Sequence, residues 1–321
     1  MINIKNNKFL VIYIILIISF TIYLLCDTFL ISKVYQVVDN NTTLNSTTNN
    51  NSNSNTSSKR GKIKNKNKSN SNTSANNITK ELTDTSYKDN NIEINIKEYN
   101  EYDTKIYVAD VILSDSSYLK TAFAKSSYGK NVTDYTSSIA KSVNAILAIN
   151  GDYYGVQQSG YVLKQGVIYR NTASNREDLV IYKNGSFEII NEKDISLEKL
   201  VEKGAYNILS FGPSLIENNK ISVTENDEVA KAMNSNPRTS IGIIDNNHYV
   251  FVVSDGRTNE SSGLTLYELT NFMKTLGCKA AYNLDGGGSS TMYFNGQVIN
   301  NPTTNGNISE RKVSDIVYIS K

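Results

Sequence analysis

The stretch of sequence that decides the fold reads TLYELTNFMKTLGCKAAYNLDGGGSST and covers residues 265–291. Its first half carries apolar side chains at the spacing of a helix buried on one face, at Leu266, Leu269, Phe272, Met273 and Leu276. Thr265 and Glu268 form the Thr-x-x-Glu pattern of a capping box, and Gly277 stands where a glycine commonly ends a helix. The pattern predicts a capped helix, then a buried strand over 279–284, and then a turn built on glycine. Glu268 is interpreted as a cap and not as a catalytic acid.

Strands dominate the sequence before this stretch. Alternating apolar residues predict strands over 92–96 and 106–112, and the continuous apolar run 145–149 predicts a buried strand. Two hairpins are expected, over 179–190 with Asn-Gly in the turn and over 241–253 with Asp-Asn-Asn in the turn. Many strands and few helices predict an α+β fold with a mixed or antiparallel central sheet.

The N-terminus carries an uncharged apolar run from Phe9 to Cys26. As a helix this run spans roughly 27 Å, close to the hydrocarbon thickness of a bilayer. Lys5 and Lys8 precede it, which favours a cytoplasmic N-terminus under the positive-inside rule. A cleaved signal peptide is the alternative, but no small-residue cleavage site stands near Cys26. We expect an uncleaved single-pass anchor in the cell membrane, with the C-terminal domain extracytoplasmic.

Composition divides the chain into three parts. Residues 1–33 are predicted as a cytoplasmic tip and a transmembrane anchor. Residues 34–90 are predicted as a disordered linker, because Asn, Ser, Thr and Lys dominate there and offer little apolar surface to bury. Residues 91–321 have the size and the apolar patterning of one folded domain.

Charge and rare residues exclude several classes of function. The net charge of +2 gives no electrostatic case for nucleic-acid binding. His248, the only histidine in the chain, begins a hairpin strand, which argues against a Ser-His-Asp triad and against a zinc hydrolase. Cys26 lies in the apolar run, so Cys278 has no disulfide partner in the domain and is interpreted as a buried structural thiol. The chemistry must therefore rest on carboxylates, arginines, amides, hydroxyls and backbone N–H groups.

Four polar segments interrupt the apolar strands, each at a strand end. They are Asn150-Gly-Asp152-Tyr-Tyr154, Asn236-Pro-Arg238-Thr-Ser240, Asp255-Gly-Arg257 and Asn283-Leu-Asp285-Gly-Gly-Gly-Ser-Ser-Thr291. Taken alone, each acidic or basic residue in them would be a turn former or a member of a surface ion pair. Together, at the ends of rigid strands, they predict one site.

Gly286, Gly287 and Gly288 directly follow a carboxylate, that of Asp285. Glycines reach positive φ and let backbone N–H groups approach a ligand oxygen without hindrance from Cβ, so the segment suits a phosphate or a developing oxyanion. A tight turn or a β-bulge would use the same residues, and the glycines alone do not decide between these interpretations. No Gly-Lys-Ser/Thr follows, so the run is not a Walker loop.

In their order along the chain, these motifs resemble the phosphodiester glycosidase domain family, that of N-acetylglucosamine-1-phosphodiester α-N-acetylglucosaminidase. The series also contains Phe211-Gly-Pro213, Gly263-Leu-Thr265, Asn301-Pro302 and Glu310-Arg311. The likeness covers about residues 100–320, and all three prolines of the chain fall within its motifs.

The resemblance implies hydrolysis of a sugar-1-phosphodiester at the anomeric carbon, which releases a free sugar and a phosphomonoester. Asp285 is the expected carboxylate that attacks the anomeric carbon or directs water to it. Asn150 and Asp152 are expected to orient sugar hydroxyls or to act as the partner base. Arg238 or Arg257 would grip phosphate oxygens in a bidentate manner. The predicted substrate-binding residues are Asp255, Arg257, Gly286, Gly287, Gly288, Ser289 and Ser290.

Cofactors and partners follow from the same residues. No cofactor is required with certainty, and a divalent cation, Ca or Mg, that bridges Asp side chains and phosphate is left open. The expected partners are the membrane, through the N-terminal helix, and a glycan or sugar-phosphate polymer of the cell envelope, such as an exopolysaccharide.

Two other functions stay open at this point. The first is a non-catalytic glycan-binding module at the cell surface, for which the 21 tyrosines would supply aromatic platforms. The second is a phosphodiesterase that cuts the P–O bond, which the single histidine disfavours because such enzymes usually rely on metal clusters or histidines.

Overall fold

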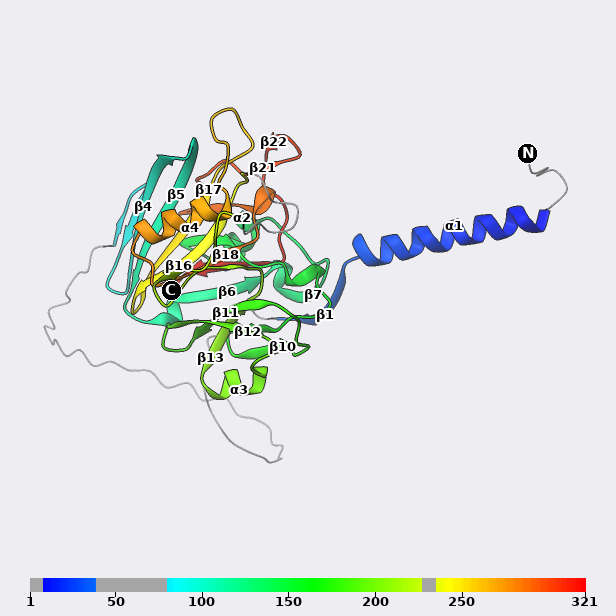
Figure 1. Cartoon of the computed structure of the whole chain (residues 1–321), viewed down its shortest axis with the longest axis horizontal. Coiled ribbons are helices and arrows are strands. Elements are labelled where there is room, and N and C mark those ends of the chain that lie inside the picture. Colours follow the sequence, from blue (N-terminus) through cyan, green and yellow to red (C-terminus); the bar gives the residue numbers. More distant parts are fainter. Residues whose placement is uncertain (1–7, 39–79, 227–234) are drawn as a thin grey trace, which may run out of the picture.

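The computed structural model describes residues 8–38, 80–226 and 235–321, and Figure 1 shows helix α1 standing clear of a strand-rich domain. The described residues contain four α-helices: α1 (Lys8–Phe29), α2 (Thr136–Ser142), α3 (Leu197–Glu202) and α4 (Leu266–Thr275). Strands outnumber these helices and form antiparallel sheets, so the predicted α+β class is confirmed.

The central sheet has nine strands in the order β15-β14-β18-β16-β17-β5-β4-β3-β2, and each neighbouring pair is antiparallel. Its strands are β2 (Glu81–Leu82), β3 (Ser86–Lys88), β4 (Ile92–Glu101), β5 (Thr104–Leu113), β14 (Ser214–Glu217), β15 (Lys220–Ile221), β16 (Thr239–Asp245), β17 (His248–Ser254) and β18 (Ala280–Leu284). The strands predicted over 92–96, 106–112 and 279–284 are β4, β5 and β18. The hairpin predicted over 241–253 is β16–β17.

A second sheet has five antiparallel strands in the order β20-β19-β8-β23-β6. They are β6 (Leu119–Phe123), β8 (Leu147–Asn150), β19 (Met292–Phe294), β20 (Gln297–Val298) and β23 (Asp315–Ile319). The run predicted as a buried strand over 145–149 supplies β8.

Smaller sheets complete the domain. The predicted hairpin over 179–190 is confirmed as β11 (Glu177–Tyr182) and β12 (Phe187–Asn191), and β13 (Ala205–Leu209) pairs with the other edge of β11. Its turn contains Gly185, whose φ of +83° is readily adopted by glycine. The two-stranded pairs are β1 (Lys33–Val37) with β7 (Ser127–Lys130), β9 (Val162–Lys164) with β10 (Val167–Arg170), and β21 (Thr303–Thr304) with β22 (Asn307–Ile308).

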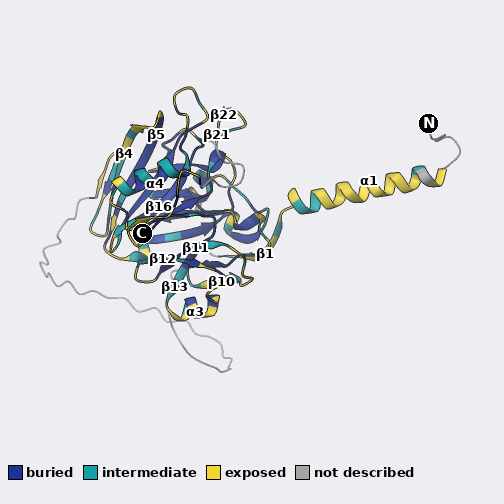
Figure 2. Ribbon diagram, viewed as in Figure 1, coloured by how far each residue is buried: buried dark blue, intermediate teal, exposed yellow. Residues whose placement is uncertain are grey.

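The main core lies between the nine-stranded and five-stranded sheets. Phe251 from the first sheet and Ile149 and Val317 from the second belong to one buried cluster. Side chains alternate along a strand, so Val252 points to the opposite face of the central sheet, where Phe272 of α4 belongs to the same second cluster. Figure 2 shows burial concentrated in these layers, whereas α1 is exposed along most of its length.

Helix α4 begins and ends as the sequence predicts. The Thr265 hydroxyl accepts a hydrogen bond from the Glu268 amide (3.1 Å), and the Glu268 carboxylate accepts one from the Thr265 amide (2.8 Å). Gly277, just beyond the helix, has a φ of +86°. The interpretation of Glu268 as a cap is therefore confirmed.

The N-terminal helix has the length and composition predicted from its apolar run. Residues Val11–Phe29 of α1 are long and apolar enough to cross a membrane, and none of this segment is buried against the domain. Most of the predicted linker, residues 39–79, lies outside the described residues.

Both ends of the predicted linker differ from the expectation of disorder over 34–90. Residues Lys33–Val37 form β1, which pairs with β7. Residues 81–88 contain β2 and β3, which extend the central sheet beyond β4, and Tyr87 is fully buried there. Residues 81–88 are mostly polar, whereas Lys33–Val37 includes two valines and a tyrosine, and in both segments the paired strands supply the backbone hydrogen bonds.

Replacing Thr265 with alanine removes the side-chain acceptor at the start of α4. We expect the free energy of unfolding to fall by about 1 kcal/mol, because the Glu268 amide loses its partner. Urea titration followed by circular dichroism measures the change. Thr275→Ala is the matched control, because the Thr275 hydroxyl bonds the Phe272 carbonyl at the other end of the helix, and it should cost less than about 0.5 kcal/mol. Equal losses in the two variants would contradict the capping role.

Candidate active site

Three strand ends of the central sheet lie side by side. Thr239, which begins β16, is paired with Val253 near the end of β17 and with Leu284 at the end of β18. Neighbouring strands run in opposite directions, so the start of β16 lies beside the ends of both partners. Three of the four predicted polar segments therefore meet at one edge of the sheet. They are residues 236–240, 255–257 and 283–291.

Asn150, at the end of β8, joins the five-stranded sheet to this edge. Its Nδ2 donates to the Asp285 carbonyl oxygen (2.6 Å), and its Oδ1 accepts from the Thr239 hydroxyl (2.8 Å) and the Thr291 amide (3.2 Å). The Asn150 side chain is fully buried. Because a buried amide left unpaired costs about 1–3 kcal/mol, these bonds hold the backbone of Asp285 in place from the interior.

A pocket of about 240 Å³ opens at this edge. Among the described residues its walls carry one carboxylate and three guanidinium groups. The lining residues are Phe211, Asn236, Pro237, Arg238, Arg257, Leu284, Asp285, Gly286, Gly287 and Arg311. The pocket thus gathers an excess of positive charge around a single acidic side chain.

The Asp285 carboxylate is fixed by two neighbours. Its Oδ2 accepts from the Ser289 hydroxyl (2.7 Å) and from Nη2 of Arg311 (3.0 Å), and its Oδ1 accepts from the same Nη2 (3.1 Å). Arg311 Nε donates to the Ser289 hydroxyl oxygen (2.8 Å), which closes the triangle. Burial raises the pKa of Asp285 above its ordinary value, and the Arg311 charge and the Ser289 hydrogen bond oppose that rise.

The other two arginines enter the pocket from the segments before β16 and after β17. Arg238 is 4% exposed, and its Nε donates to the Leu264 carbonyl oxygen (2.8 Å). Arg257 donates from Nε (3.1 Å) and Nη2 (2.8 Å) to Oδ1 of Asn236. The Asn236 carboxamide is a neutral partner, so the Arg257 guanidinium keeps its charge and suits an anionic ligand.

The glycine run lets other groups approach the pocket closely. A Cβ on Gly287 would lie 3.0 Å from Nη2 of Arg257, and the φ of this residue is +63°. A Cβ on Gly286 would lie 2.9 Å from the Pro237 carbonyl oxygen, which accepts the Gly287 amide (2.8 Å). The Gly287 N–H is thus bound to the backbone, and Gly287 allows close packing against Arg257 while Gly286 allows it against Pro237.

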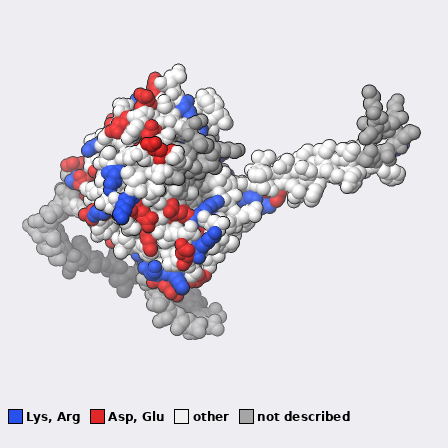
Figure 3. All heavy atoms as spheres, in the orientation of Figure 1, with Lys and Arg blue, Asp and Glu red and all other residues white. Residues whose placement is uncertain are grey.

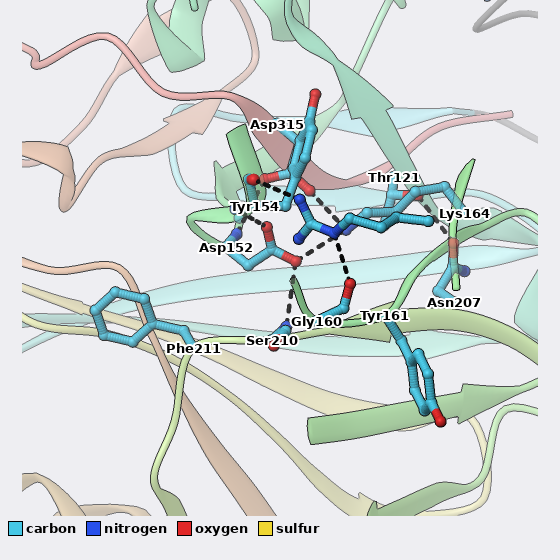
Figure 4. Close-up of polar contacts among 12 residues, drawn as sticks. Thr121, Asp152, Tyr154, Gly160, Tyr161, Lys164, Asn207, Ser210, Phe211 and Asp315 are labelled. Atoms are coloured by element: carbon cyan, nitrogen blue, oxygen red, sulfur yellow. Dashed lines mark hydrogen bonds and ion pairs between the residues drawn. The ribbon is translucent and has the colours of Figure 1, made fainter. Parts of the chain in front are cut away.

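Asp152 belongs to a buried charge cluster with Lys164 and Asp315, which Figure 4 shows. Nζ of Lys164 donates to Oδ2 of Asp315 (2.6 Å) and to Oδ2 of Asp152 (3.2 Å). The amides of Asp152 and Ser210 add bonds to the two carboxylates (3.0 and 3.2 Å). The cluster links the ends of β8, β9 and β23, and a Cβ on Gly151 would collide with the Asp315 carboxylate.

The electrostatics of this cluster follow from its burial. Burial raises the pKa of Asp315 to about 6, with the charge of Asp152 adding to the rise and Lys164 opposing it. For Lys164, burial lowers the pKa, but the two carboxylates outweigh that effect and the net shift is upward. The lysine is therefore held in its charged form by its partners.

Asp255 holds a neighbouring turn. Its Oδ1 accepts from the Asn301 amide (2.8 Å) and from Nδ2 of Asn300 (3.2 Å). Burial raises the pKa of Asp255, and these bonds oppose the rise. The Asn300 carboxamide also bonds Ser290 and Met292 through their backbones, so Asp255 supports the end of the glycine segment.

The structure separates the predicted site residues into two groups. Those that line the pocket are Asp285, Arg238, Arg257, Gly286 and Gly287. Those that are buried and do not line it are Asn150, Asp152, Asp255, Gly288, Ser289 and Ser290. The catalytic and binding roles of all these residues stay predictions.

Sequence reasoning did not select Arg311, Asn236 or Phe211 as site residues. Arg311 stands in the Glu310-Arg311 motif, but its pairing with Asp285 spans 26 positions and is invisible to any local pattern. Asn236 is the first residue of a predicted polar segment, but the sequence does not show that its side chain bonds Arg257. Phe211 opens the Phe211-Gly-Pro213 motif, and its ring packs edge-on against Tyr153 (6.4 Å between centroids).

His248 and Cys278, which the sequence analysis excluded from the site, do not line the pocket. His248 begins β17 and its Nε2 lies 2.6 Å from Oδ1 of Asp110 on β5. Cys278 is fully buried, and burial raises the pKa of its thiol to about 12. Within residues 8–38, 80–226 and 235–321, no group of three or more His, Cys, Asp or Glu side chains is arranged to hold a metal ion. A divalent cation shared with a bound phosphate stays a prediction.

Comparison with known proteins supports the fold and the motifs. The sequence profile of the phosphodiester glycosidase family matches residues 143–320. The SPbeta prophage-derived uncharacterized protein YomE of Bacillus subtilis is 30% identical over 201 residues, which is 60% of this chain and 30% of that protein. This chain therefore spans less than a third of the length of that curated relative.

Among solved structures, the zebrafish N-acetylglucosamine-1-phosphodiester alpha-N-acetylglucosaminidase catalytic domain, auto-inhibited by its pro-peptide, has the same fold. The TM-score is 0.57 at 18% sequence identity, and the match covers 72% of this chain and 83% of that chain. At this identity the likeness concerns the fold.

Replacing Lys164 with methionine leaves two buried carboxylates without their counter-charge. We expect the free energy of unfolding to fall by about 3–5 kcal/mol, as for other broken buried ion pairs, measured by urea denaturation of the full chain in detergent. Lys279→Met is the control, because the Lys279–Asp245 pair is exposed, and it should change the stability far less. Adding Asp315→Asn to Lys164→Met should restore part of the loss. If the free energy of unfolding fell only as little as in the control, the cluster would not be an important source of stability.

Proposed function

The chain belongs to the phosphodiester glycosidase family, and we propose that it hydrolyses a sugar-1-phosphodiester at the anomeric carbon, with Asp285 at the centre of the reaction. One observation carries the proposal: among the described residues, the pocket at the start of β16 and the ends of β17 and β18 is lined by one carboxylate and three arginines. The family cleaves glycosidic phosphodiesters. The particular substrate, its place at the cell surface and the roles of the residues are what we propose.

The chemistry of the leaving group explains this set of residues. Most glycosidases use two carboxyl groups, because a poor alkoxide leaving group must be protonated by one of them. A phosphomonoester leaves more readily, since its second pKa is about 6, but its negative charge must be held. Arginines do this with charge-assisted, bidentate hydrogen bonds, each worth about 1.5–3 kcal/mol. The described lining of the pocket, with one carboxylate together with Arg238 and Arg257, suits such a substrate.

Asp285 is the group that acts at the sugar. Ser289 and Arg311 fix the orientation of its carboxylate, and Oδ1 carries fewer bonds than Oδ2. Oδ1 therefore attacks the anomeric carbon or takes a proton from the water that does. The bond between the anomeric carbon and the bridging oxygen breaks, the oxygen leaves with the phosphate, and the water oxygen becomes the sugar hydroxyl.

The sugar has an aromatic wall in this arrangement. Phe211 lines the pocket and is supported by the Tyr153 ring, which is 42% exposed. Aromatic faces pack against the apolar face of a sugar ring. Tyr153 lies in the same polar segment as Asp152, so the buried cluster with Lys164 sets the position of this wall. We therefore give Asp152 and Asn150 positioning roles.

The expected location limits the substrate. We place α1 in the cell membrane and the domain on the extracytoplasmic side, on the length and composition of Val11–Phe29 and on the lysines before it. The substrate is then a surface glycan or a related glycoconjugate joined through sugar phosphates.

Asp285→Asn tests the proposal directly. With a panel of sugar-1-phosphodiesters and the full chain in detergent, kcat/KM for release of reducing sugar should fall by about 10²–10⁴-fold, because the amide cannot attack or accept a proton. Asp245→Asn is the matched control, since Asp245 is an exposed carboxylate on the β16–β17 hairpin, and it should keep full activity. The anomeric configuration of the released sugar separates attack by Asp285, which retains it, from delivery of water, which inverts it.

Further arms of this assay separate the alternatives. In ¹⁸O water, label in the sugar supports the glycosidase, and label in the phosphate would replace it with a phosphodiesterase that cuts the P–O bond. Binding of surface polymer with no turnover on any substrate would favour the non-catalytic module. Loss of activity in EDTA that Ca or Mg restores would add a cation to the site.

Arg311 sets the pH range of the reaction. Asp285 must be ionised to act, so activity is lost as the pH falls through its pKa, which burial raises above the ordinary value of about 3.9. Arg311→Gln removes the charge that opposes this rise. The acid limb of the profile of kcat/KM against pH should therefore move to higher pH, whereas Lys279→Gln should leave it in place. An unchanged acid limb in Arg311→Gln would mean that another group controls the profile.

A further inference from the structure

The anchor helix is tied to the folded domain within a few residues of its end. Nδ2 of Asn131 donates to the carbonyl oxygens of Thr28 (3.0 Å) and Ile31 (3.2 Å), and the Ser32 hydroxyl donates to the Asn131 carbonyl oxygen (2.7 Å). Strand β1 follows at once and pairs with β7, with Lys33 opposite Lys130 and Val34 opposite Gly129. The chain is thus attached to the domain before residue 39, and the predicted linker does not separate the helix from the domain.

A second pocket, of about 300 Å³, lies where β1 meets the domain. Its described lining contains Lys33, Lys130 and Arg170 together with tyrosines and glutamines, and it contains no acidic residue. Asp27, in the last turns of α1, forms an ion pair with Lys33 (2.7 Å). Arg170 donates to the carbonyl oxygens of Gly160 (2.6 Å), Gln157 (2.7 Å) and Tyr154 (3.2 Å), which are neutral, so its charge is not cancelled by these partners.

Exposed apolar side chains flank this basic pocket on three elements. Val37 and Tyr35 of β1 are 77% and 62% exposed, and Val156 of η4 (Tyr154–Val156) and Val167 and Ile168 of β10 are at least 40% exposed. The three elements converge on one buried cluster, which contains Tyr154 of η4 and packs against Tyr169 of β10 and Val38, the residue after β1. We call the exposed surface of β1, η4 and β10 around the pocket the juxtamembrane face.

The juxtamembrane face has the composition of a membrane-contacting surface. Cations next to exposed aromatic and aliphatic side chains are typical of protein surfaces at the lipid–water interface. Figure 1 shows β1, β7 and β10 at the end of the domain from which α1 departs, and Figure 3 shows charged atoms at the foot of the helix, next to its long uncharged stretch. A helix that spans the bilayer would therefore bring this face to the headgroups.

We propose that the juxtamembrane face docks onto the membrane that α1 crosses, and that its basic pocket takes the phosphate headgroup of an anionic phospholipid. The inference rests on the proposed membrane placement of α1. It is independent of the reaction, because the second pocket shares no lining residue with the pocket around Asp285. Docking fixes the height of the active site above the bilayer and directs the enzyme to glycosyl phosphodiesters close to the membrane.

The test uses the full chain in lipid nanodiscs with a fluorophore on β10. Val167→Cys carries the label in a Cys26→Ser background, and the remaining thiol, Cys278, is fully buried and does not compete. Quenching by headgroup-labelled lipid is measured in discs of phosphatidylcholine alone and of phosphatidylcholine with about one third phosphatidylglycerol. We expect stronger quenching in the anionic discs and its loss in high salt, because salt screens the attraction.

Charge variants assign the effect to the pocket. Lys33→Gln and Lys130→Gln should each lower the docking equilibrium in anionic discs by about fivefold, the effect of one lysine near an anionic surface. Lys88→Gln is the matched control, because Lys88 also forms a close surface ion pair, with Glu93 (2.8 Å), and belongs to β3 of the central sheet, outside the juxtamembrane face, so it should have no effect. Asp285→Asn should dock like the parent chain, which keeps this result apart from the test of activity.

Three results would overturn the proposal. Quenching that is independent of lipid charge, or that falls equally in Lys88→Gln, would show that the pocket does not recognise the headgroup. Stabilisation of the detergent-solubilised chain by inorganic phosphate that depends on Lys130, with no effect of lipid charge, would make it a site for free phosphate. A chain that does not co-purify with the discs would remove the membrane placement of α1 and this inference with it.

Discussion

The carboxamide of Asn150 is the interaction on which the site depends. It is fully buried at the junction of the two large sheets, and it bonds the backbone on both sides of the glycine run, at Asp285 and at Thr291. Its third partner, the Thr239 hydroxyl, belongs to the first residue of β16. A buried amide has no water to replace these partners, so the end of β8, the start of β16 and the turn after β18 hold one relative position. The orientation of the Asp285 side chain follows from that constraint.

The charged side chains around this junction form a buried group and a group that lines the pocket. The buried residues Asp152, Lys164 and Asp315 form ion pairs with one another and link three strand ends. At the wall of the pocket, Arg311 faces Asp285. Arg238 and Arg257 add two further positive charges to the described lining of the pocket. An excess of positive charge around one carboxylate suits a substrate that carries a phosphate on the bond to be broken.

The loop after β8 connects the active site with the juxtamembrane face. It begins at Asn150, beneath the active site, and Gly151 accepts the Asp285 amide (3.4 Å). Four residues later Tyr154 stacks on Tyr128 of β7, the strand that pairs with β1 (5.5 Å between centroids). The segment that supports the catalytic pocket is therefore also part of the juxtamembrane face, so the distance between the active site and the anchor is set by packed structure.

The sequence by itself determined the elements that depend on neighbours close in the chain. The capping box at Thr265, the Asn184-Gly185 hairpin and the apolar run of α1 are such local features, and each was predicted where it lies. The positions of the four polar segments at strand ends were also readable, because a change from apolar to polar residues marks the end of a buried strand.

Only the tertiary structure decided which of these residues face the pocket. Antiparallel register brought the segments together, and Arg311 became the partner of Asp285 through contacts that span many residues, for which a single sequence carries no local signal. The partner of β1 is likewise distant in the chain: Val34, Tyr35 and Val37 favour a strand locally, but only the structure shows that this strand pairs with β7.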